Sequence, residues 1–351
     1  MPLISSESSS PTIAGLWINN PLIVLSEARA KIADLRPLRI WLLNNMPDAA
    51  LKATEQQFLR LIGSEPVLQI EPVLMTCTWV KRSEETAEYI KKYYTLIQDV
   101  QRKWLDALII SWANFWNGSI NGLPFWNELT DIFQWAESSV SSILTSCLAT
   151  HAVMKYKHDI DRVLNTWVEW VSKKIWWVFD HKVTNDAHPL VTGMNSNLLV
   201  PHSRWNSISE DVFKQSWNQV LIAGTAWVHL ATSHDFRYVM MQWHPEYDSV
   251  SLAREYLRDK KLWLSHAPSN YLTQEIRLLN VDRSYSNDEL QKIGNPENNW
   301  RDSAQVMMAR WIGLVYRITN IDITKQYMDG IDPSDPLWSL IIQSTPTQHS
   351  A

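Results

Sequence analysis

Glycine is what this sequence most clearly lacks. Its 351 residues include 9 glycines, whereas a soluble domain of this length at the usual ~7% would contain about 25. Tryptophan is in excess, with 20 residues, and the two together give 9 + 20 = 29, close to the combined total of an ordinary protein. The deficit of glycine therefore balances the excess of tryptophan. This balance raises the question whether some tryptophans stand at positions where the backbone needs glycine.

Cysteine is also scarce. The two cysteines, Cys77 and Cys147, cannot form a disulfide framework. In an intracellular enzyme a lone cysteine is a candidate nucleophile. For Cys77 we favour the other interpretation, a small buried core residue.

Long apolar runs and long runs of like charge are absent as well. No segment approaches the roughly 20 apolar residues that cross a bilayer, and Met1–Thr12 is polar and serine-rich, which predicts a disordered leader. The net charge of -5 is spread along the chain. We therefore expect a cytoplasmic protein that binds neither membrane nor nucleic acid. Nothing in the pattern indicates a metal site or a bound cofactor.

What is present is an alternation of short apolar runs with amphipathic stretches, which is typical of parallel strands joined by helices. The prediction is an α/β fold, a doubly wound and mostly parallel sheet flanked by helices, with ligands at the carboxyl ends of the strands. The expected strands are Leu38–Leu43, Val67–Met75, Ala107–Ile110 and Ser142–Thr145, and the expected helices are Lys52–Ile62, Ala87–Val100, Phe125–Ala136 and Ala304–Val315.

Cys147 follows one of these strands and precedes the helix-prone segment Leu148–Tyr156. A thiol at a strand-to-helix turn has a helix N-terminus behind it, which lowers its pKa and offers backbone N–H groups to an oxyanion. A buried and inert cysteine would fit the same position. The sequence around this residue alone leaves both interpretations open.

A second chemical feature is the segment His244-Pro245-Glu246, which follows the apolar run Tyr238–Met241. Residues two apart on an extended chain face the same side, so Glu246 is placed to hold the tautomer of the His244 imidazole. Together with Cys147 these residues would form a Cys-His-Glu relay.

At these positions the chain resembles the homoserine O-acyltransferases of methionine biosynthesis, which have a class I glutamine amidotransferase fold with a flavodoxin-like core. The resemblance runs from about Leu38 to Asp259 and resumes near the C-terminus. It rests on Asn44-Asn45-Met46-Pro47, Thr54-Glu55-Gln56-Gln57-Phe58-Leu59, Phe179-Asp180-His181-Lys182, Pro201-His202-Ser203-Arg204, His244-Pro245-Glu246-Tyr247-Asp248, Arg258-Asp259, Asn299-Trp300-Arg301 and Arg310-Trp311.

The resemblance implies a domain organisation. Residues 1–34 would be an N-terminal leader, partly disordered, and residues 35–260 the amidotransferase-like acyltransferase domain. Residues 261–351 would be a C-terminal extension that packs on the core and ends in a disordered, Pro-rich tail. By family analogy we expect a homodimer.

It also implies roles for individual residues. Cys147 corresponds to the nucleophile that takes the acyl group from acyl-CoA, His244 to the general base and Glu246 to its orienting carboxylate. Arg258 corresponds to the arginine that binds the homoserine carboxylate, and Lys174 and Ser203 to further substrate positions. The Leu148 backbone N–H would contribute to the oxyanion hole. The partners are thus the small molecules homoserine and acyl-CoA, with acyl-CoA a co-substrate and no cofactor.

Two other function classes remain open. An amidotransferase-like hydrolase could use the same Cys-His-Glu set on glutamine, with an ammonia-accepting partner. A catalytically dead binding protein is the third possibility, if tryptophans fill the site.

The tryptophans bear on that last possibility. Four tryptophans occupy positions where the family carries glycine: Trp112, Trp177, Trp227 and Trp243. Trp116 occupies a position where the succinyl-transferring members carry glycine, and Phe236 replaces another glycine of the family. Either a codon read as glycine in the source organism has been translated as tryptophan, or the protein is truly tryptophan-rich with a remodelled pocket. Trp116 matters most, because glycine there accompanies succinyl-CoA and glutamate acetyl-CoA in the family. A misread glycine therefore implies succinyl transfer, which we favour over acetyl.

Overall fold

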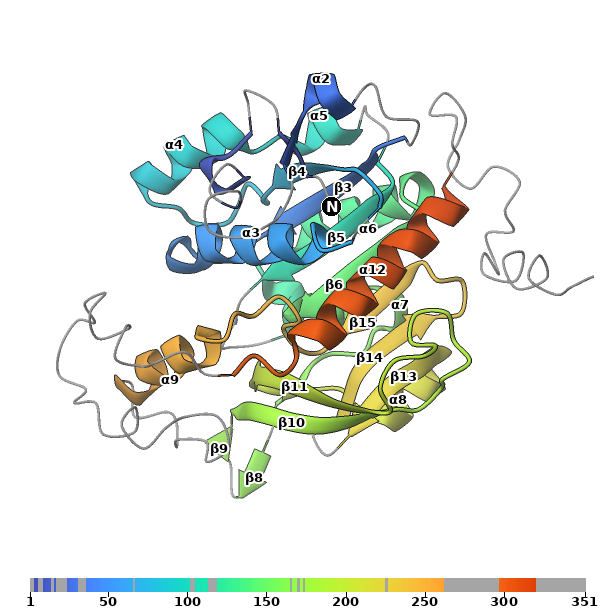
Figure 1. The fold of residues 1–351 in the computed structure, drawn as a ribbon. Helices are drawn as coiled ribbons and strands as arrows, with labels where there is room; N and C mark the ends of the chain where they lie inside the picture. Colours follow the sequence, from blue (N-terminus) through green and yellow to red (C-terminus); the bar gives the residue numbers. More distant parts are fainter. Residues whose placement is uncertain are drawn as a thin grey trace, which may run out of the picture.

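The structure is a computed structural model, built around one long twisted sheet (Figure 1). It describes residues 3–5, 9–13, 16, 24–30, 36–65, 67–101, 105–112, 119–164, 166–168, 171–172, 174–224, 227–261 and 297–319. Within these residues the sheet has eleven strands in the order β11-β10-β13-β14-β15-β6-β5-β3-β4-β1-β2.

The strands of this sheet are β1 (Leu3–Ser5), β2 (Val24–Ser26), β3 (Leu38–Asn44), β4 (Ile70–Met75), β5 (Ala107–Trp112), β6 (Ser142–Cys147), β10 (Ile175–Val183), β11 (Asn197–Arg204), β13 (Asn218–Gly224), β14 (Trp227–Ser233) and β15 (Tyr238–Met241). Two small sheets pair β7 (Val163–Leu164) with β12 (Asn206–Ser207), and β8 (Thr166–Val168) with β9 (Val171–Ser172). The helices are α2 (Glu27–Ala30), α3 (Asp48–Ile62), α4 (Glu84–Tyr93), α5 (Ile97–Gln101), α6 (Trp126–Ser139), α7 (Leu148–His158), α8 (Glu210–Gln215), α9 (Ser251–Lys261), α12 (Arg301–Ile318) and a 3-10 turn at Ile120–Gly122.

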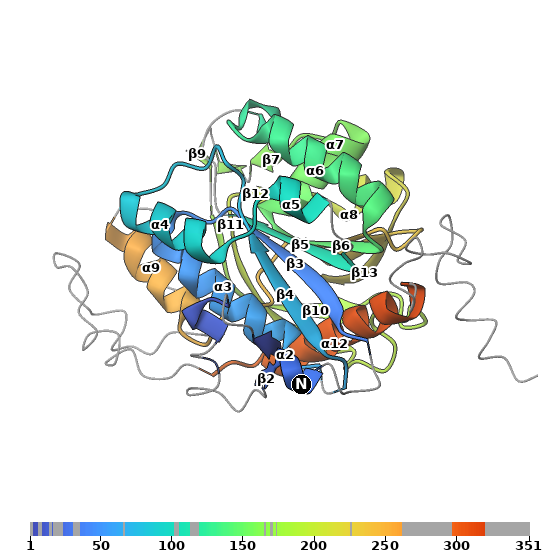
Figure 2. The same ribbon diagram turned by 90° about the horizontal axis from the view of Figure 1, so that it is seen from above.

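From β15 to β2 every neighbouring pair of strands is parallel, which confirms the doubly wound α/β prediction. Strands β5 and β6 are buried along their whole length, as expected when helices cover both faces. Helices α3 and α12 pack on one face, and α6 and α7 on the other (Figure 2). The four strands predicted from apolar runs all form, with ends shifted by up to three residues.

The other end of the sheet is antiparallel: β15, β14, β13, β10 and β11 pair in that order. None of these was among the four strands expected from the sequence, although the apolar run Tyr238–Met241 forms β15. This half brings Lys174, just before β10, beside Ser203 at the end of β11, because Ile175 pairs with Arg204.

The structure differs from the sequence prediction in two places. The single helix expected at Ala87–Val100 is two helices, α4 and α5, because the chain is extended at Tyr94 and the Thr95 N–H bonds to the Leu74 carbonyl of β4 at 2.8 Å. Within the predicted leader Met1–Thr12, Leu3–Ser5 form β1, which pairs with β4 and β2. The apolar residues of this short strand give it a place in the sheet.

The C-terminal helix α12 packs on the sheet through Trp311, whose indole Nε1 donates to Ser142 Oγ of β6 at 3.0 Å. The predicted tail Asp332–Ala351 lies outside the described residues. None of the helices described in the structure is long and apolar enough to span a bilayer.

Candidate active site

Cys147 is the last residue of β6 and the residue from which α7 begins. Its backbone has φ 56° and ψ -115°, a conformation that non-glycine residues rarely adopt. Strained backbone of this kind occurs mostly at functional sites. The turn directs the thiol to the carboxyl edge of the sheet, with the N–H groups of the first turn of α7, starting at Leu148, lacking partners within the helix. The structure thus places Cys147 at a strand-to-helix turn, as the sequence predicted.

Cys77 has different surroundings. It is 1% exposed, and it accepts a hydrogen bond from Asn45 Nδ2 at 3.2 Å. Burial, with the nearby carboxylate of Glu128, raises the pKa of the Cys77 thiol far above its ordinary value. Cys77 is therefore a buried neutral thiol, as the sequence predicted.

His244 and Glu246 form the expected pair, with 2.8 Å between Nδ1 and Oε1. Both side chains are almost fully buried. Burial alone would lower the pKa of His244, but Cys147 and Glu246 outweigh burial through charge and hydrogen bonds and raise the pKa well above its ordinary value. An imidazolium beside Cys147, held by a carboxylate behind it, is the charge arrangement of a thiolate nucleophile and its acid-base partner.

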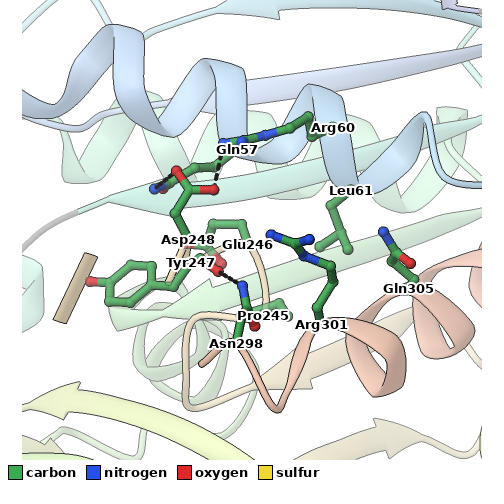
Figure 3. Close-up of a pocket in the computed structure, with 10 residues that line it drawn as sticks. All are labelled: Gln57, Arg60, Leu61, Pro245, Glu246, Tyr247, Asp248, Asn298, Arg301 and Gln305. Carbon is green, nitrogen blue, oxygen red and sulfur yellow. Dashed lines mark hydrogen bonds and ion pairs between the residues drawn. The ribbon is translucent and has the colours of Figure 1, made fainter. Parts of the chain in front are cut away.

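The loop that carries this pair is fixed from two sides (Figure 3). On the α3 side, Asp248 accepts from Gln57 Nε2 at 3.2 Å and pairs with Arg60 at 2.6 Å. On the α12 side, the Tyr247 carbonyl accepts from Asn298 Nδ2 at 3.4 Å and from Trp300 Nε1 at 3.0 Å. Gln57 and Trp300, which belong to two of the motifs that carry the resemblance, therefore fix the loop that carries His244 and Glu246.

The three predicted substrate residues converge on a carboxylate that the sequence reasoning missed, Glu255 of α9. Lys174 Nζ lies 2.9 Å from Glu255 Oε2, the Ser203 hydroxyl donates to the same oxygen, and Arg258 Nη2 is 3.6 Å from it. Asp259 pairs with both Lys174 and Arg258. We call these five residues, Lys174, Ser203, Glu255, Arg258 and Asp259, the acceptor cluster. One signal could have revealed Glu255: it precedes Arg258 by three residues on a helix, which puts both on one face.

The acceptor cluster touches the relay through Tyr247. The Tyr247 ring stacks on the His244 imidazole, with centroids 4.2 Å apart and 11° between planes, and its hydroxyl donates to Glu255. Burial would raise the pKa of Glu255, but Lys174, Arg258 and His244 outweigh it and lower the pKa to about 2. Glu255 is therefore a fixed negative charge, 18% exposed, beside the tyrosine that stacks on His244.

Arg258 is the outward-facing member of the cluster. Its side chain is 57% exposed, whereas that of Lys174 is 2% exposed and bonded to two carboxylates. A ligand can therefore reach the Arg258 guanidinium directly, while Lys174 and Ser203 hold Glu255 in place.

Arg204 is a second buried cation of the site that the sequence did not single out. It lies 5.4 Å from the Trp227 ring centroid, and its Nη1 donates to Ser207 Oγ at 2.9 Å. Burial lowers its pKa to about 10, an effect that the nearby Cys147 opposes.

The tryptophans at glycine positions have unequal surroundings. Trp112 pairs with Cys147 in the sheet, and Trp243 precedes His244; both are 1% exposed. Neither has a positive φ, whereas Trp227 has φ 66° and Phe236 has φ 56°, in the region that favours glycine. Trp177 pairs with His202 on β11, and Trp116 lies outside the described residues.

Several known proteins resemble this chain. A solved glutamine amidotransferase from Thermotoga maritima has a TM-score of 0.47 and 9% identity, covering 80% of this chain and 99% of its own. In sequence, the chain is 38% identical over 354 residues to a homoserine O-succinyltransferase of Thiobacillus denitrificans, covering 96% of this chain and 99% of the relative. It is 39% identical over 337 residues to a homoserine O-succinyltransferase of Thiothrix nivea, covering 90% and 92% of the two chains.

These relatives share almost their whole length with this chain. The family profile described as homoserine O-succinyltransferase matches residues 4–321, a range that includes the relay and the acceptor cluster. On both grounds, the chain belongs to the homoserine O-succinyltransferase family.

Proposed function

We propose that this enzyme transfers a succinyl group from succinyl-CoA to the hydroxyl of homoserine through a thioester on Cys147. The observation that carries the mechanism is the relay in which Cys147 and Glu246 together raise the pKa of His244. The acyl acceptor and donor follow from the family, whose relatives are named homoserine O-succinyltransferase.

In the first half-reaction the Cys147 thiolate attacks the thioester carbonyl of the donor. The carbonyl oxygen becomes an oxyanion, which the Leu148 N–H at the start of α7 stabilises. The tetrahedral intermediate collapses, the C–S bond to CoA breaks, and the CoA thiolate takes the proton from the His244 imidazolium. Succinyl-Cys147 and neutral His244 result.

In the second half-reaction neutral His244 accepts the proton of the homoserine hydroxyl as its oxygen attacks the Cys147 thioester. The Cys147 thiolate leaves, so the thiolate-imidazolium pair is restored. Glu246 stabilises the imidazolium in both steps and keeps the ring oriented through its 2.8 Å bond to Nδ1.

Homoserine is an amino acid, with a carboxylate and an ammonium group. The exposed Arg258 guanidinium offers two donors to the carboxylate, and Glu255 offers a negative charge to the ammonium. Both side chains are on one face of α9, and Glu255 contacts the tyrosine that stacks on His244. This arrangement would hold the substrate hydroxyl on the side of the site that faces the base.

The test is release of free CoA from succinyl-CoA, with and without homoserine, together with the intact mass of the protein. We expect homoserine-dependent release and, without homoserine, a mass increase of one succinyl group that Cys147→Ala abolishes. Ammonia release from glutamine, without reaction of acyl-CoA, would overturn the proposal in favour of a hydrolase.

The same assay, run on a variant with glycine at five positions, separates the two interpretations of the tryptophans; the positions are Trp112, Trp116, Trp177, Trp227 and Trp243. Turnover by the protein that carries all five tryptophans would show that the indoles leave the site open. Turnover by the glycine variant alone would support misdecoding, and acetyl-CoA as a second donor shows which acyl group the pocket takes.

A further inference from the structure

A cavity of about 450 Å³ lies at the carboxyl end of β4, away from the relay. The segment that follows β4 forms one wall, with Thr76, Thr78, Val80 and Arg82, and helix α4 forms the other. Its volume is in the range of small-molecule sites in proteins.

Helix α4 faces this cavity with an incompletely buried apolar side. None of its ten residues is buried, although Ile90 and Ala87 line the cavity wall. The helix is nevertheless well defined at its start, where Ser83 Oγ accepts from the Thr86 N–H at 3.4 Å and Glu84 and Glu85 occupy the first turn. A capped helix that leaves its apolar side open to a cavity has surface available for a ligand.

The cavity and the nucleophile share one edge of the sheet. Strands β6, β5, β3 and β4 are neighbours and parallel, so their carboxyl ends point the same way. With strands spaced about 4.8 Å apart, three spacings put the end of β4 about 14 Å from Cys147. In Figure 1, α4 and α9 lie at this same side of the sheet.

The chemistry of the walls is mixed. Val80, Ile90 and Leu96 are apolar, Thr76 and Thr78 carry hydroxyls, and Lys91 is an exposed cation at the rim. Arg82 is held in the wall by hydrogen bonds to Thr76 Oγ1 at 2.8 Å and to the Met46 carbonyl at 2.5 Å, and Asp48 pairs with its charge at 3.3 Å. Glu128 of α6 binds the Thr78 backbone on the opposite wall, and Lys91 lies in the last turn of α4, away from Glu84 and Glu85 in its first turn.

We infer that this cavity binds the pantetheine arm of acyl-CoA and that Lys91 contacts its phosphates, an inference that rests on the function proposed above. The arm has apolar methylenes and methyl groups that match the apolar walls, and amides that match the threonine hydroxyls. The arm would run along the strand ends from Cys147, and the phosphates would leave the cavity at Lys91.

The experiment measures binding of CoA itself by calorimetry, because binding does not depend on turnover. Ala87→Phe fills the cavity from an exposed helix position without disturbing the core, and Lys91→Glu reverses the charge at the rim. We expect each change to raise the Kd for CoA about tenfold, equivalent to about 1.4 kcal/mol. Lys92→Glu is the matched control, because it makes the same charge change at the next residue, whose ammonium lies over the Tyr93 ring.

Kinetics give a second readout. Both variants should raise the KM for succinyl-CoA while leaving the KM for homoserine unchanged, and succinyl-N-acetylcysteamine, a donor without nucleotide and phosphates, should be used equally well by wild type and Lys91→Glu. An unchanged Kd in folded Ala87→Phe and Lys91→Glu, or no CoA binding by the wild type, overturns the inference. CoA binding that both variants weaken, without acyl transfer to homoserine, supports the cavity and overturns the proposed function instead.

Discussion

The two parts of the active site, the relay and the acceptor cluster, are built in different ways. The relay of Cys147, His244 and Glu246 is set by the backbone: a strained turn after β6 and a short loop after β15, on neighbouring parallel strands. The acceptor cluster is set by side chains from three separate segments, the residue before β10, the end of β11 and α9, which meet at Glu255. The first arrangement is rigid and local, whereas the second depends on long-range packing and on charge balance.

The largest expected effect comes from the relay. Cys147→Ala should lower kcat at least about 10⁴-fold, because the nucleophile of both half-reactions is lost. The steady-state rate of CoA release measures this, and CD melting checks the fold. Retention of homoserine-dependent release by this variant would contradict the covalent mechanism and leave direct transfer between the two substrates.

Glu255→Gln should separate the two parts. It keeps the shape of the side chain and leaves Lys174 its second partner, Asp259. We expect the second half-reaction to slow about 10³-fold, because the charge beside the homoserine ammonium is removed. The first half-reaction, measured as a burst of CoA release in stopped flow, should be nearly unchanged. If the burst disappears as well, Glu255 acts on the relay through His244, and the two parts are one unit.

The difference between the two parts also explains what the sequence could predict. The relay was visible because its determinants are local: an apolar run, a cysteine at its end, and a histidine two residues before a glutamate. The buried parallel strands were visible for the same reason. Lys174, Ser203 and Arg258 were identified only through the resemblance, and Glu255 was not found at all, because its role depends on the pairing of β10 with β11 and on the place of α9. The antiparallel strands, and the break of the helix at Tyr94, likewise depend on contacts between distant segments.

Acid stability gives a smaller effect that is specific to the acceptor cluster. The pKa of Glu255 is lowered from 4.5 to about 2 in the folded protein. Its contribution to stability is therefore present above pH 4.5 and is lost as the pH falls towards 2, because the unfolded chain binds the proton first. The full effect is about 3 kcal/mol, and it accrues at about 1.4 kcal/mol per pH unit below 4.5.

Urea unfolding at pH 6 and pH 3.5 measures this term. The wild type should lose about 1.4 kcal/mol more than Glu255→Gln between these two pH values. Equal losses would show that the cluster does not hold Glu255 as a charged group. Asp48→Asn, at the start of α3 and remote from the cluster, serves as a comparison, because the pKa of Asp48 is also lowered to about 2, here by Ser83 and Arg82.

The smallest effect concerns tryptophan and glycine. Trp217 is 81% exposed and has a φ of 59°. It follows Ser216, the C-cap residue of α8. This is the position after a helix where glycine is the usual residue, because a side chain with positive φ costs about 1–2 kcal/mol. Trp217→Gly removes that strain but adds the flexibility of glycine to the unfolded chain, about 0.5–1 kcal/mol. The net expectation is a gain of about 0.5–1 kcal/mol and a rise in Tm of about 1–4 °C.

Trp79→Gly is the matched control. Trp79 is 70% exposed, and its φ is not positive, so the same substitution should bring no gain. If Trp217→Gly is stabilising and Trp79→Gly is not, the backbone at 217 is a glycine position by its own geometry, as at Trp227 and Phe236. Equal losses in both variants would instead show that the chain has adapted to the indole. Peptide masses from the source organism at 217 and 227 then decide whether the ribosome inserts glycine or tryptophan at these positions.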